Sequence, residues 1–265
     1  QVEIDGLSGT VLCTTIQNSE TVLNLKGKVS TQIGIPVREQ RLLAGTEELA
    51  DTDELGVVDA LAANGILRLS LLRRTEEQAE WLDKVQESSK VLKHAPSHIR
   101  EYEEVVLAAV RRHPPSLRFA AEELRAKREV VLAAVQRHGC ALEYAAERLL
   151  SDRDVVLAAL KTSGMALEYA APVLCDDKDL VLCAVQKHGS ALEFASEGLR
   201  GDSEVVLAAV QSNGLALRYA SEVLRGNLQI CMAALEQNTL ALRYVQGEVV
   251  ALALQQALNR SADQD

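Results

Sequence analysis

The sequence predicts a two-domain α+β protein in which a small mixed domain precedes an all-α solenoid of two-helix repeats. Three observations support this fold class. Of the 265 residues, 48% are hydrophobic but only 3% are aromatic, which favours closely packed helices over an aromatic-rich β-sandwich. The octapeptide EVVLAAVQ occurs at residues 129–136 and again at 204–211. The first 74 residues contain instead the short alternating runs that are typical of strands.

The N-terminal segment predicts strands and a helix in the order ββαββ. VEIDGLSGTVLCTTI alternates around a Ser-Gly turn, as a hairpin does. SETVLNLKGKVSTQI then places Val22, Leu25 and Val29 on one helix face. Further short strands are expected in GIPVREQRLLAGTEEL and in ILRLSLL.

The residues GIP…EQRLLAG…L…D…L, from Gly34 to Leu55, closely resemble ubiquitin and ubiquitin-like domains. The resemblance covers residues 1–74 and implies a β-grasp fold. Where ubiquitin ends in a free di-glycine tail, this chain reads LLRRTEEQ and continues. We therefore expect a built-in, non-conjugatable ubiquitin-like domain.

Ubiquitin-like domains commonly bind partners through an apolar patch on the sheet that is flanked by basic side chains. The resemblance assigns this role to Leu7, Arg41, Leu43, Arg68 and Ser70. Two departures weaken the patch: Ser70 stands where the family has Val, and RLLAG is one residue shorter than the ubiquitin segment RLIFAG. A core position for Leu43 is the alternative.

A 25-residue period organises the rest of the chain and is typical of a repeat array. Related copies of EVVLAAV begin at residues 104, 129, 154, 179, 204 and 229. Behind each copy a leucine is followed two residues later by an aromatic side chain, at Phe119, Tyr144, Tyr169, Phe194, Tyr219 and Tyr244. Residues 75–265 are thus predicted to form about seven units, with a capping repeat at 79–103, repeats at 104–250 and a C-terminal cap at 251–265.

Each unit predicts two short helices that need their neighbours for stability. The first helix is capped at its N-terminus by a polar side chain, which is Asp152, Asp177, Asp202 or Asn227. It ends at a glycine for which we expect a left-handed backbone conformation: Gly139, Gly164, Gly189 or Gly214. The second runs through ALEYAAERL, with Leu142, Ala145 and Leu149 on one stripe. A strand of a leucine-rich repeat is the competing interpretation of VVLAAV, but the paired alanines, the caps and the glycines favour helices.

The repeat resembles the consensus D-x-E-V-V-L-A-A-V-x-x-N-G-x-A-L-x-Y-A-S-x-x-L of a family of protist and algal proteins that is defined only as a domain of unknown function. The resemblance covers about residues 79–250. It implies helical repeats and protein interaction, with no established chemistry.

No catalytic, cofactor-binding or metal-binding constellation is apparent, and we expect no enzyme activity. The sequence lacks a nucleophile motif, a phosphate-binding glycine loop and a Cys/His ligand spacing. His113, His138 and His188 share one repeat position and could form a metal or proton-relay ladder. Units with Ser163, Asn213 and Asn238 interrupt it, which favours a polar residue facing the negative end of a helix.

The aromatic side chains of the repeats are the candidate binding residues of the array. Tyr144, Tyr169, Phe194 and Tyr219 either line an outer surface, where tyrosine often anchors interfaces, or pack between repeats.

The expected partners are proteins. A net charge of −10 disfavours nucleic acid, and no apolar run is long enough for direct membrane insertion. The five cysteines include no C-x-x-C pair, which indicates a reducing compartment. This compartment is either the cytoplasm or the interior of an organelle, namely a stroma or a matrix. The sequence begins at Gln1 without a methionine, so no targeting segment is visible.

These features predict a non-enzymatic interaction scaffold or adaptor. A structural or peripheral subunit of a larger complex, in the cytoplasm or in an organelle, is one alternative. An adaptor to the ubiquitin and proteasome machinery is another.

Overall fold

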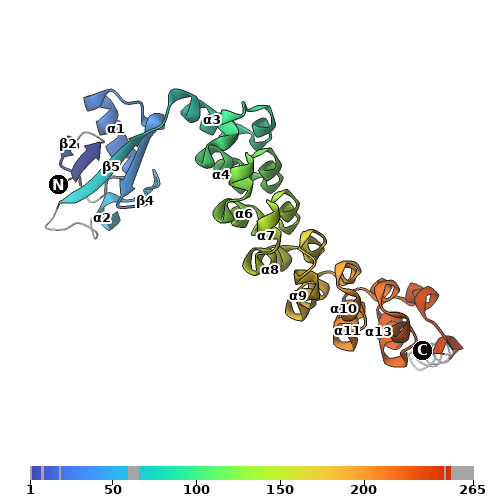
Figure 1. Cartoon of the computed structure of the whole chain (residues 1–265). Coiled ribbons are helices and arrows are strands. Elements are labelled where there is room, and N and C mark those ends of the chain that lie inside the picture. The colour runs from blue at the N-terminus through green and yellow to red at the C-terminus, as the bar shows by residue number, and fades with distance from the viewer. Residues whose placement is uncertain (1, 7–8, 18, 59–65, 248, 252–265) are drawn as a thin grey trace. The chain divides into compact units, whose positions relative to one another are not determined.

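The computed structural model describes residues 2–6, 9–17, 19–58, 66–247 and 249–251 (Figure 1). The chain divides into two compact units, Gln1–Lys84 and Val85–Asp265. The division lies inside helix α3 (Glu76–Glu87), whereas the sequence suggests a boundary after residue 74. Residues 76–84 of α3 belong to the first unit, where Glu76 pairs with Arg38, at 3.4 Å between Oε1 and Nη2. Of the expected C-terminal cap, residues 252–265 lie outside the described part.

The first unit is a β-grasp domain. Its elements are β1 (Val2–Gly6), β2 (Gly9–Thr14), α1 (Val22–Ile33), η1 (Val37–Glu39), β3 (Gln40–Ala44), β4 (Glu47–Glu48), α2 (Leu55–Val58) and β5 (Leu67–Arg73). The strands form one mixed sheet in the order β2-β1-β5-β3-β4. Strands β1 and β5 are parallel and the other pairs are antiparallel. The predicted ββαββ order is confirmed with two additions, the two-residue strand β4 and the short helix α2.

Helix α1 packs its predicted apolar face into the core of this domain. Val22, Leu25 and Val29 are fully buried together with alternate residues of the strands, including Ile4 and Leu42. Thr21 begins the helix, since its side chain accepts from the Asn24 amide in a capping box. Gly34 ends it with a φ of 74°, which glycine adopts without steric cost.

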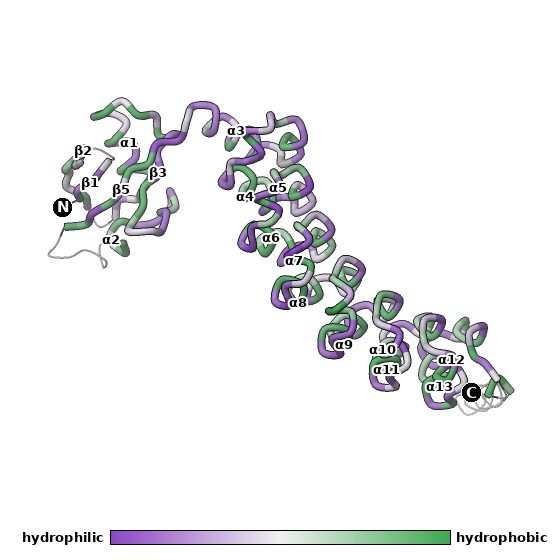
Figure 2. The backbone as a smooth tube through the Cα atoms, viewed as in Figure 1, coloured by the Kyte–Doolittle hydropathy of each residue, from purple (hydrophilic) through white to green (hydrophobic). Residues whose placement is uncertain are grey.

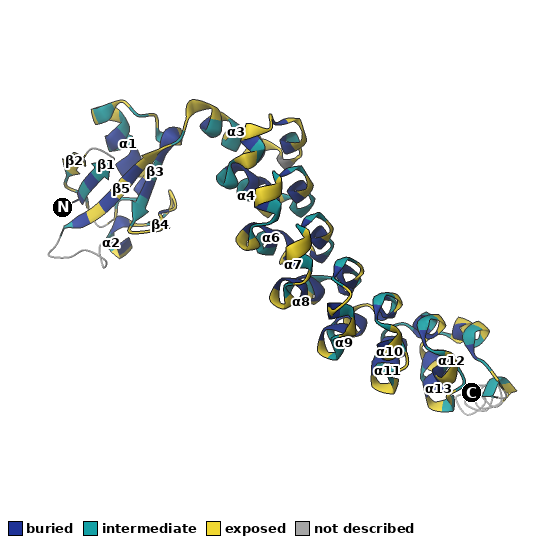
Figure 3. Ribbon diagram, viewed as in Figure 1, coloured by how far each residue is buried: buried dark blue, intermediate teal, exposed yellow. Residues whose placement is uncertain are grey.

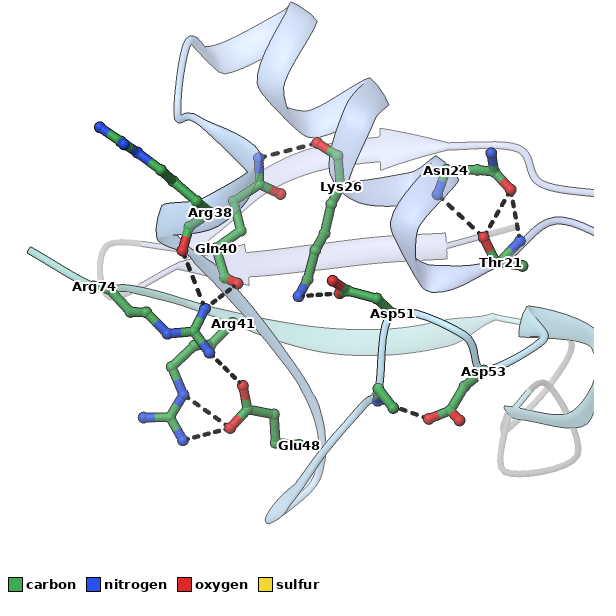
Figure 4. A network of polar contacts seen from close by, with 11 residues as sticks. Thr21, Asn24, Lys26, Arg38, Gln40, Arg41, Glu48, Asp51, Asp53 and Arg74 are labelled. Atoms are coloured by element: carbon green, nitrogen blue, oxygen red, sulfur yellow. Dashed lines mark hydrogen bonds and ion pairs between the residues drawn. The ribbon is translucent and has the colours of Figure 1, made fainter. Parts of the chain in front are cut away.

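Buried polar groups under the sheet are held by short contacts (Figure 4). The Lys26 ammonium lies 2.6 Å from Oδ1 of Asp51. The Gln40 amide donates to the carbonyl oxygens of Lys26 and Ile35, at 3.0 and 2.7 Å. These bonds compensate for the loss of water around the Lys26 ammonium and the Gln40 NH2 group, whereas the buried Gln40 Oε1 has no hydrogen-bond partner among the described residues.

The second unit repeats one α-helix, one 3₁₀ helix and one short helical segment. The longer helices, called A helices below, are α4 (Glu103–Arg112), α6 (Arg128–Val135), α8 (Arg153–Thr162), α9 (Lys178–Lys187), α11 (Ser203–Ser212) and α13 (Leu228–Gln237). The 3₁₀ helices are η3 (Ser89–His94), η5 (Pro114–Phe119), η6 (Gly139–Tyr144), η7 (Gly164–Tyr169), η9 (Gly189–Phe194), η10 (Gly214–Tyr219) and η11 (Thr239–Tyr244). The short segments are η4 (His98–Glu101), α5 (Glu122–Arg125), α7 (Glu147–Leu150), η8 (Leu174–Asp176), α10 (Glu197–Arg200) and α12 (Glu222–Arg225).

The VVLAAV segments are helical, so the strand interpretation is wrong. In α6, Val130, Val131, Ala134 and Val135 are fully buried, and the equivalent positions are buried in each A helix. Figure 3 shows the same division of buried and exposed residues in each repeat, and Figure 2 shows hydrophobic stretches recurring with it. The predicted capping repeat at 79–103 also has buried apolar positions, at Val85, Leu92, Ala95 and Ile99.

The predicted second helix is interrupted in the structure. The 3₁₀ helix η6 ends at Tyr144, Ala145 and Ala146 are extended, and α7 begins at Glu147. The reason is a backbone hydrogen bond between repeats, in which the Ala146 amide donates to the Arg125 carbonyl at 2.9 Å. The bond recurs every 25 residues, from the amides of residues 121, 146, 171, 196, 221 and 246. Backbone groups that a continuous helix would pair internally thus join neighbouring repeats.

The expectation of left-handed glycines at the A-helix ends is wrong. Among the described glycines, only Gly9, Gly34, Gly45 and Gly247 have a positive φ. A Cβ on Gly139, Gly164, Gly189 or Gly214 would instead lie under 3.0 Å from a carbonyl oxygen of the next A helix. For Gly164 that oxygen belongs to Ala184. Close approach of two repeats, rather than backbone conformation, requires glycine here.

The predicted N-caps are present. The side chains of Asp152, Asp177, Asp202 and Asn227 each accept from two amides in the first turn of the next helix. Three caps also bind a cation at the start of the preceding A helix: Arg128 contacts Asp152, Arg153 contacts Asp177 and Lys178 contacts Asp202, at 2.8–3.1 Å. Capping and inter-repeat pairing therefore use the same carboxylates.

Candidate protein-binding surfaces

The sheet register brings four predicted binding residues to one face of the β-grasp domain. Leu43 on β3 pairs with Ser70 on β5, and Arg41 pairs with Leu72. Because Leu42, Leu69 and Leu71 point into the core, the residues that alternate with them face outward. Arg68 lies on this outer face, beside Glu3 of β1. Leu7 lies outside the described residues.

We call this face the sheet surface; it comprises Glu3, Arg41, Leu43, Glu48, Arg68, Ser70 and Leu72. Leu43 is half-buried, and Leu72 is 38% exposed. Leu72 was missed by the sequence reasoning, although its alternation with the buried Leu71 is a visible signal. Leu43 and Leu72 therefore supply the apolar part of the surface.

The cations of the sheet surface are paired with carboxylates. Arg41 binds Glu48 at 2.8 Å, and Arg68 lies 3.1 Å from Glu3. Glu48 also binds Arg74, which follows β5, at 2.9 Å (Figure 4 shows the Glu48 contacts). These acids were also missed, because their proximity to the arginines depends on strand pairing. The surface is consequently less basic than its sequence suggests.

The aromatic side chains of the array form a second surface along the 3₁₀ helices. Phe119, Tyr144, Tyr169, Phe194, Tyr219 and Tyr244 are all half-buried, so each ring packs on the array and also reaches solvent. The residue before each ring is charged and exposed: Arg118, Glu143, Glu168, Glu193, Arg218 and Arg243. We call these twelve residues the aromatic ridge.

Cations and carboxylates both approach the rings of the ridge. The guanidinium of Arg118 lies 4.4 Å from the ring centre of Phe119, that of Arg218 lies 4.3 Å from Tyr219 and that of Arg243 lies 6.0 Å from Tyr244. Burial raises the pKa of Tyr169, and Glu168 and Glu143 beside it raise it further.

The charged positions of the ridge were missed by the sequence reasoning. A signal was available, because this position changes sign while the leucine before it and the aromatic after it stay constant. Lys93 occupies the same position in η3, so the order of charges along the array is two cations, three acids and two cations.

The repeated histidine position has a packing role at His188. Its Nδ1 accepts a hydrogen bond from the Gly164 amide of the preceding repeat at 3.0 Å. The Gly189 and Gly214 amides donate instead to Ser212 Oγ and Gln237 Oε1, at 3.1 and 2.5 Å. Different side chains thus satisfy the same buried donor, which agrees with an architectural role.

The described part of the chain holds no group of three or more His, Cys, Asp or Glu side chains placed to bind a metal ion. None of its helices has the length and apolar character needed to cross a membrane.

All five cysteines are free, and burial raises the pKa of the Cys175 and Cys231 thiols.

The two folds define the class of protein: a ubiquitin-like domain joined to an array of helical repeats. Family models match both parts. The model of the ubiquitin family matches residues 2–64, and the model described as domain of unknown function (DUF4116) matches residues 82–125, 127–174, 152–200 and 202–248. The chain belongs to this DUF4116 family. A search of the curated proteins finds no match to it.

Proposed function

We propose that this protein is a non-enzymatic interaction scaffold or adaptor whose helical repeats form the binding platform. The observation that carries the proposal is the aromatic ridge, in which a constant frame of half-buried rings presents exposed residues of changing charge. A fixed frame with variable side chains is how repeat proteins create binding surfaces. Charged and aromatic neighbours also suit protein partners, since aromatic side chains anchor many interfaces.

The ubiquitin-like domain is proposed to act within the chain and not as a modifier. The residues at the end of β5 and directly after it are engaged: Arg73 pairs with Glu39 at 2.8 Å, Arg74 binds Glu48 at 2.9 Å, and α3 follows at Glu76. This segment replaces the free tail that conjugation requires.

Affinity purification with the tagged full chain tests the platform role. We expect protein partners in near-stoichiometric amounts, and we expect the variant Glu143→Lys/Glu168→Lys to lose them while its melting profile is unchanged. The control Glu129→Lys changes charge at the exposed start of α6 and should retain them. Failure to recover any partner above background, with both domains folded, contradicts the proposal.

An adaptor role toward ubiquitin-binding proteins is the second candidate, and the exposure of Leu72 next to Leu43 favours it. We expect Leu43→Glu or Leu72→Glu to abolish binding to such a receptor without unfolding the domain. Since the neighbouring arginines are already paired with Glu3 and Glu48, Glu48→Gln should strengthen the binding of an acidic receptor. Undiminished binding by the leucine variants would exclude the sheet surface.

A further inference from the structure

The aromatic ridge holds cations over its rings at both ends but not in the middle. Arg118 stacks on Phe119, and Arg218 stacks on Tyr219. In the three repeats between them the same position is Glu143, Glu168 or Glu193. Among the described residues no cation lies over the rings of Tyr144, Tyr169 or Phe194, and neither Glu143 nor Glu168 forms an ion pair.

The Arg-bearing repeats show what this position can hold. The Arg218 guanidinium stacks on the Tyr219 ring and bonds to the Tyr219 hydroxyl. Its pKa is raised by hydrogen bonds to the hydroxyls of Tyr219 and, in the next repeat, Tyr244. A guanidinium therefore fits between the aromatic side chains of two successive repeats.

The middle repeats offer the same rings with carboxylates beside them. Tyr169 is flanked by Glu143 of the preceding repeat and by its own neighbour Glu168, both of which raise its pKa in addition to burial. Burial raises the pKa of Tyr219, and the Glu193 carboxylate of the preceding repeat raises it further. A carboxylate and an aromatic face are the two groups that bind a guanidinium most effectively, one by a bidentate ion pair and the other by stacking.

We propose that the central ridge, Glu143–Tyr144, Glu168–Tyr169 and Glu193–Phe194, binds an extended segment of a partner protein through arginine side chains, one for each repeat. The inference rests on the proposed platform function and names the chemistry of its partner. Arginine from the partner takes the position that Arg118 and Arg218 fill within the chain. The overall charge of −10 attracts such a segment from a distance.

The spacing of the arginines follows from the spacing of the repeats. Packed helices lie about 8–10 Å apart, and three residues of a polyproline II segment span about 9 Å. This conformation also has about three residues per turn, so that every third side chain points the same way. The partner motif is therefore Arg-x-x-Arg-x-x-Arg. The cations at either end, Lys93 and Arg118 on one side and Arg218 and Arg243 on the other, limit the motif to these three repeats.

The test measures binding of fluorescent peptides to the full chain by anisotropy. The probes are an (Arg-Pro-Pro)₃ peptide, the matching (Lys-Pro-Pro)₃ peptide and a peptide with three arginines at every second residue. We expect the first to bind about tenfold more tightly than the lysine peptide, because lysine lacks the planar group that stacks and bonds in pairs. The peptide with the shorter spacing should also bind more weakly. Equal affinities for the three peptides would overturn the proposal.

Three protein variants assign the site. Glu143→Gln/Glu168→Gln/Glu193→Gln should lose binding of the arginine peptide. Glu168→Arg should lose it too while melting at or above the wild-type temperature, since the new guanidinium can stack on Tyr169. The control Glu129→Gln/Asp154→Asn/Asp179→Asn removes the same charge from the A helices and should bind normally.

Each other outcome contradicts the proposal. Equal weakening by the control would mean that only net charge matters. Wild-type self-association that the triple glutamine variant abolishes would identify a second copy of this chain as the occupant. Partner recovery from lysate is measured separately. If the arginine peptide does not bind but partners are recovered, only the arginine-binding proposal is contradicted. If no partner is recovered, the platform function is contradicted as well.

Discussion

At the scale of single residues, the glycine that follows each A helix is the most constrained position of the array. A Cβ at Gly164 would lie under 3.0 Å from the backbone of Ala184. Neither group can rotate away, because both atoms are fixed by the backbone. The interface between two repeats must therefore open to accept a side chain.

We predict that Gly164→Ala destabilises the protein by about 1–3 kcal/mol, the cost of overpacking a close contact. Urea unfolding followed by circular dichroism measures the change. The control is Gly198→Ala in α10, where the nearest atom to a new Cβ is 3.8 Å away. This variant should gain about 0.4–1 kcal/mol through the unfolded chain. Similar midpoints for the two variants would show that the repeats do not pack as closely as described.

The small residues of the A helices are a second residue-scale constraint. Ala134 is fully buried in α6. We predict that Ala134→Asp costs on the order of 3–5 kcal/mol, because it places an unpaired charge in the core. Gln136→Asp, at an exposed position of the same repeat, should cost less than about 1 kcal/mol. An unchanged melting profile for Ala134→Asp would mean that this face is exposed.

At the scale of the element, one carboxylate both begins an A helix and joins it to the previous repeat. Asp177 accepts from the amides of Asp179 and Leu180 and binds Arg153 at 2.8 Å. The bond from Arg153 holds the pKa of Asp177 below its usual range, and Lys178 does the same for Asp202. Helix capping and repeat stacking are consequently coupled to the ionisation of these side chains.

We predict that acid weakens this coupling. Because the folded state lowers these pKa values, the carboxylates stabilise it fully above the unfolded aspartate pKa of about 3.9. That stabilisation is lost as the pH falls through the lower folded-state pKa. Unfolding free energies between about pH 6 and pH 2 should therefore fall more steeply for the wild type than for Asp177→Asn/Asp202→Asn.

The two substitutions at Asp177 separate the cap from the ion pair. Asparagine retains a capping oxygen, whereas Asp177→Ala removes it and should cost about 1 kcal/mol more at neutral pH. Parallel pH profiles for the wild type and the double asparagine variant would contradict the assigned role of the ionised caps.

At the scale of the whole molecule, the contacts of the array recur with the period of the sequence. The backbone bond from Ala146 to Arg125, the approach of Gly164 to Ala184 and the pair between Arg153 and Asp177 each join adjacent repeats. Such an array is stabilised by nearest-neighbour interfaces, so whole units can be removed without changing the rest.

We predict that deletion of residues 153–177, one complete period, leaves a folded protein with a lower unfolding midpoint. In the joined chain Asp152 directly precedes Lys178 and caps α9, so its ion pair with Arg128 is retained. Gly139 then packs against the carbonyl of Ala184, which takes the place of Ala159. Deletion of residues 153–165 breaks the period and should unfold the array around the junction. Circular dichroism and urea unfolding distinguish the two. Loss of structure in the first deletion would show that the repeats are not interchangeable units.

The sequence by itself determined the β-grasp domain, the helical repeats, their buried positions and their caps. These depend on local periodicity and on side chains such as Asp177 that bond within a few residues. The tertiary structure alone decided where the second helix breaks, why glycine follows each A helix, and which acids neutralise Arg41 and Arg68. The break and the glycines involve partners from the neighbouring repeat, and the neutralising acids come from adjacent strands of the sheet. Their chemistry is visible in the sequence, but their proximity is created only by packing one repeat, or one strand, against the next.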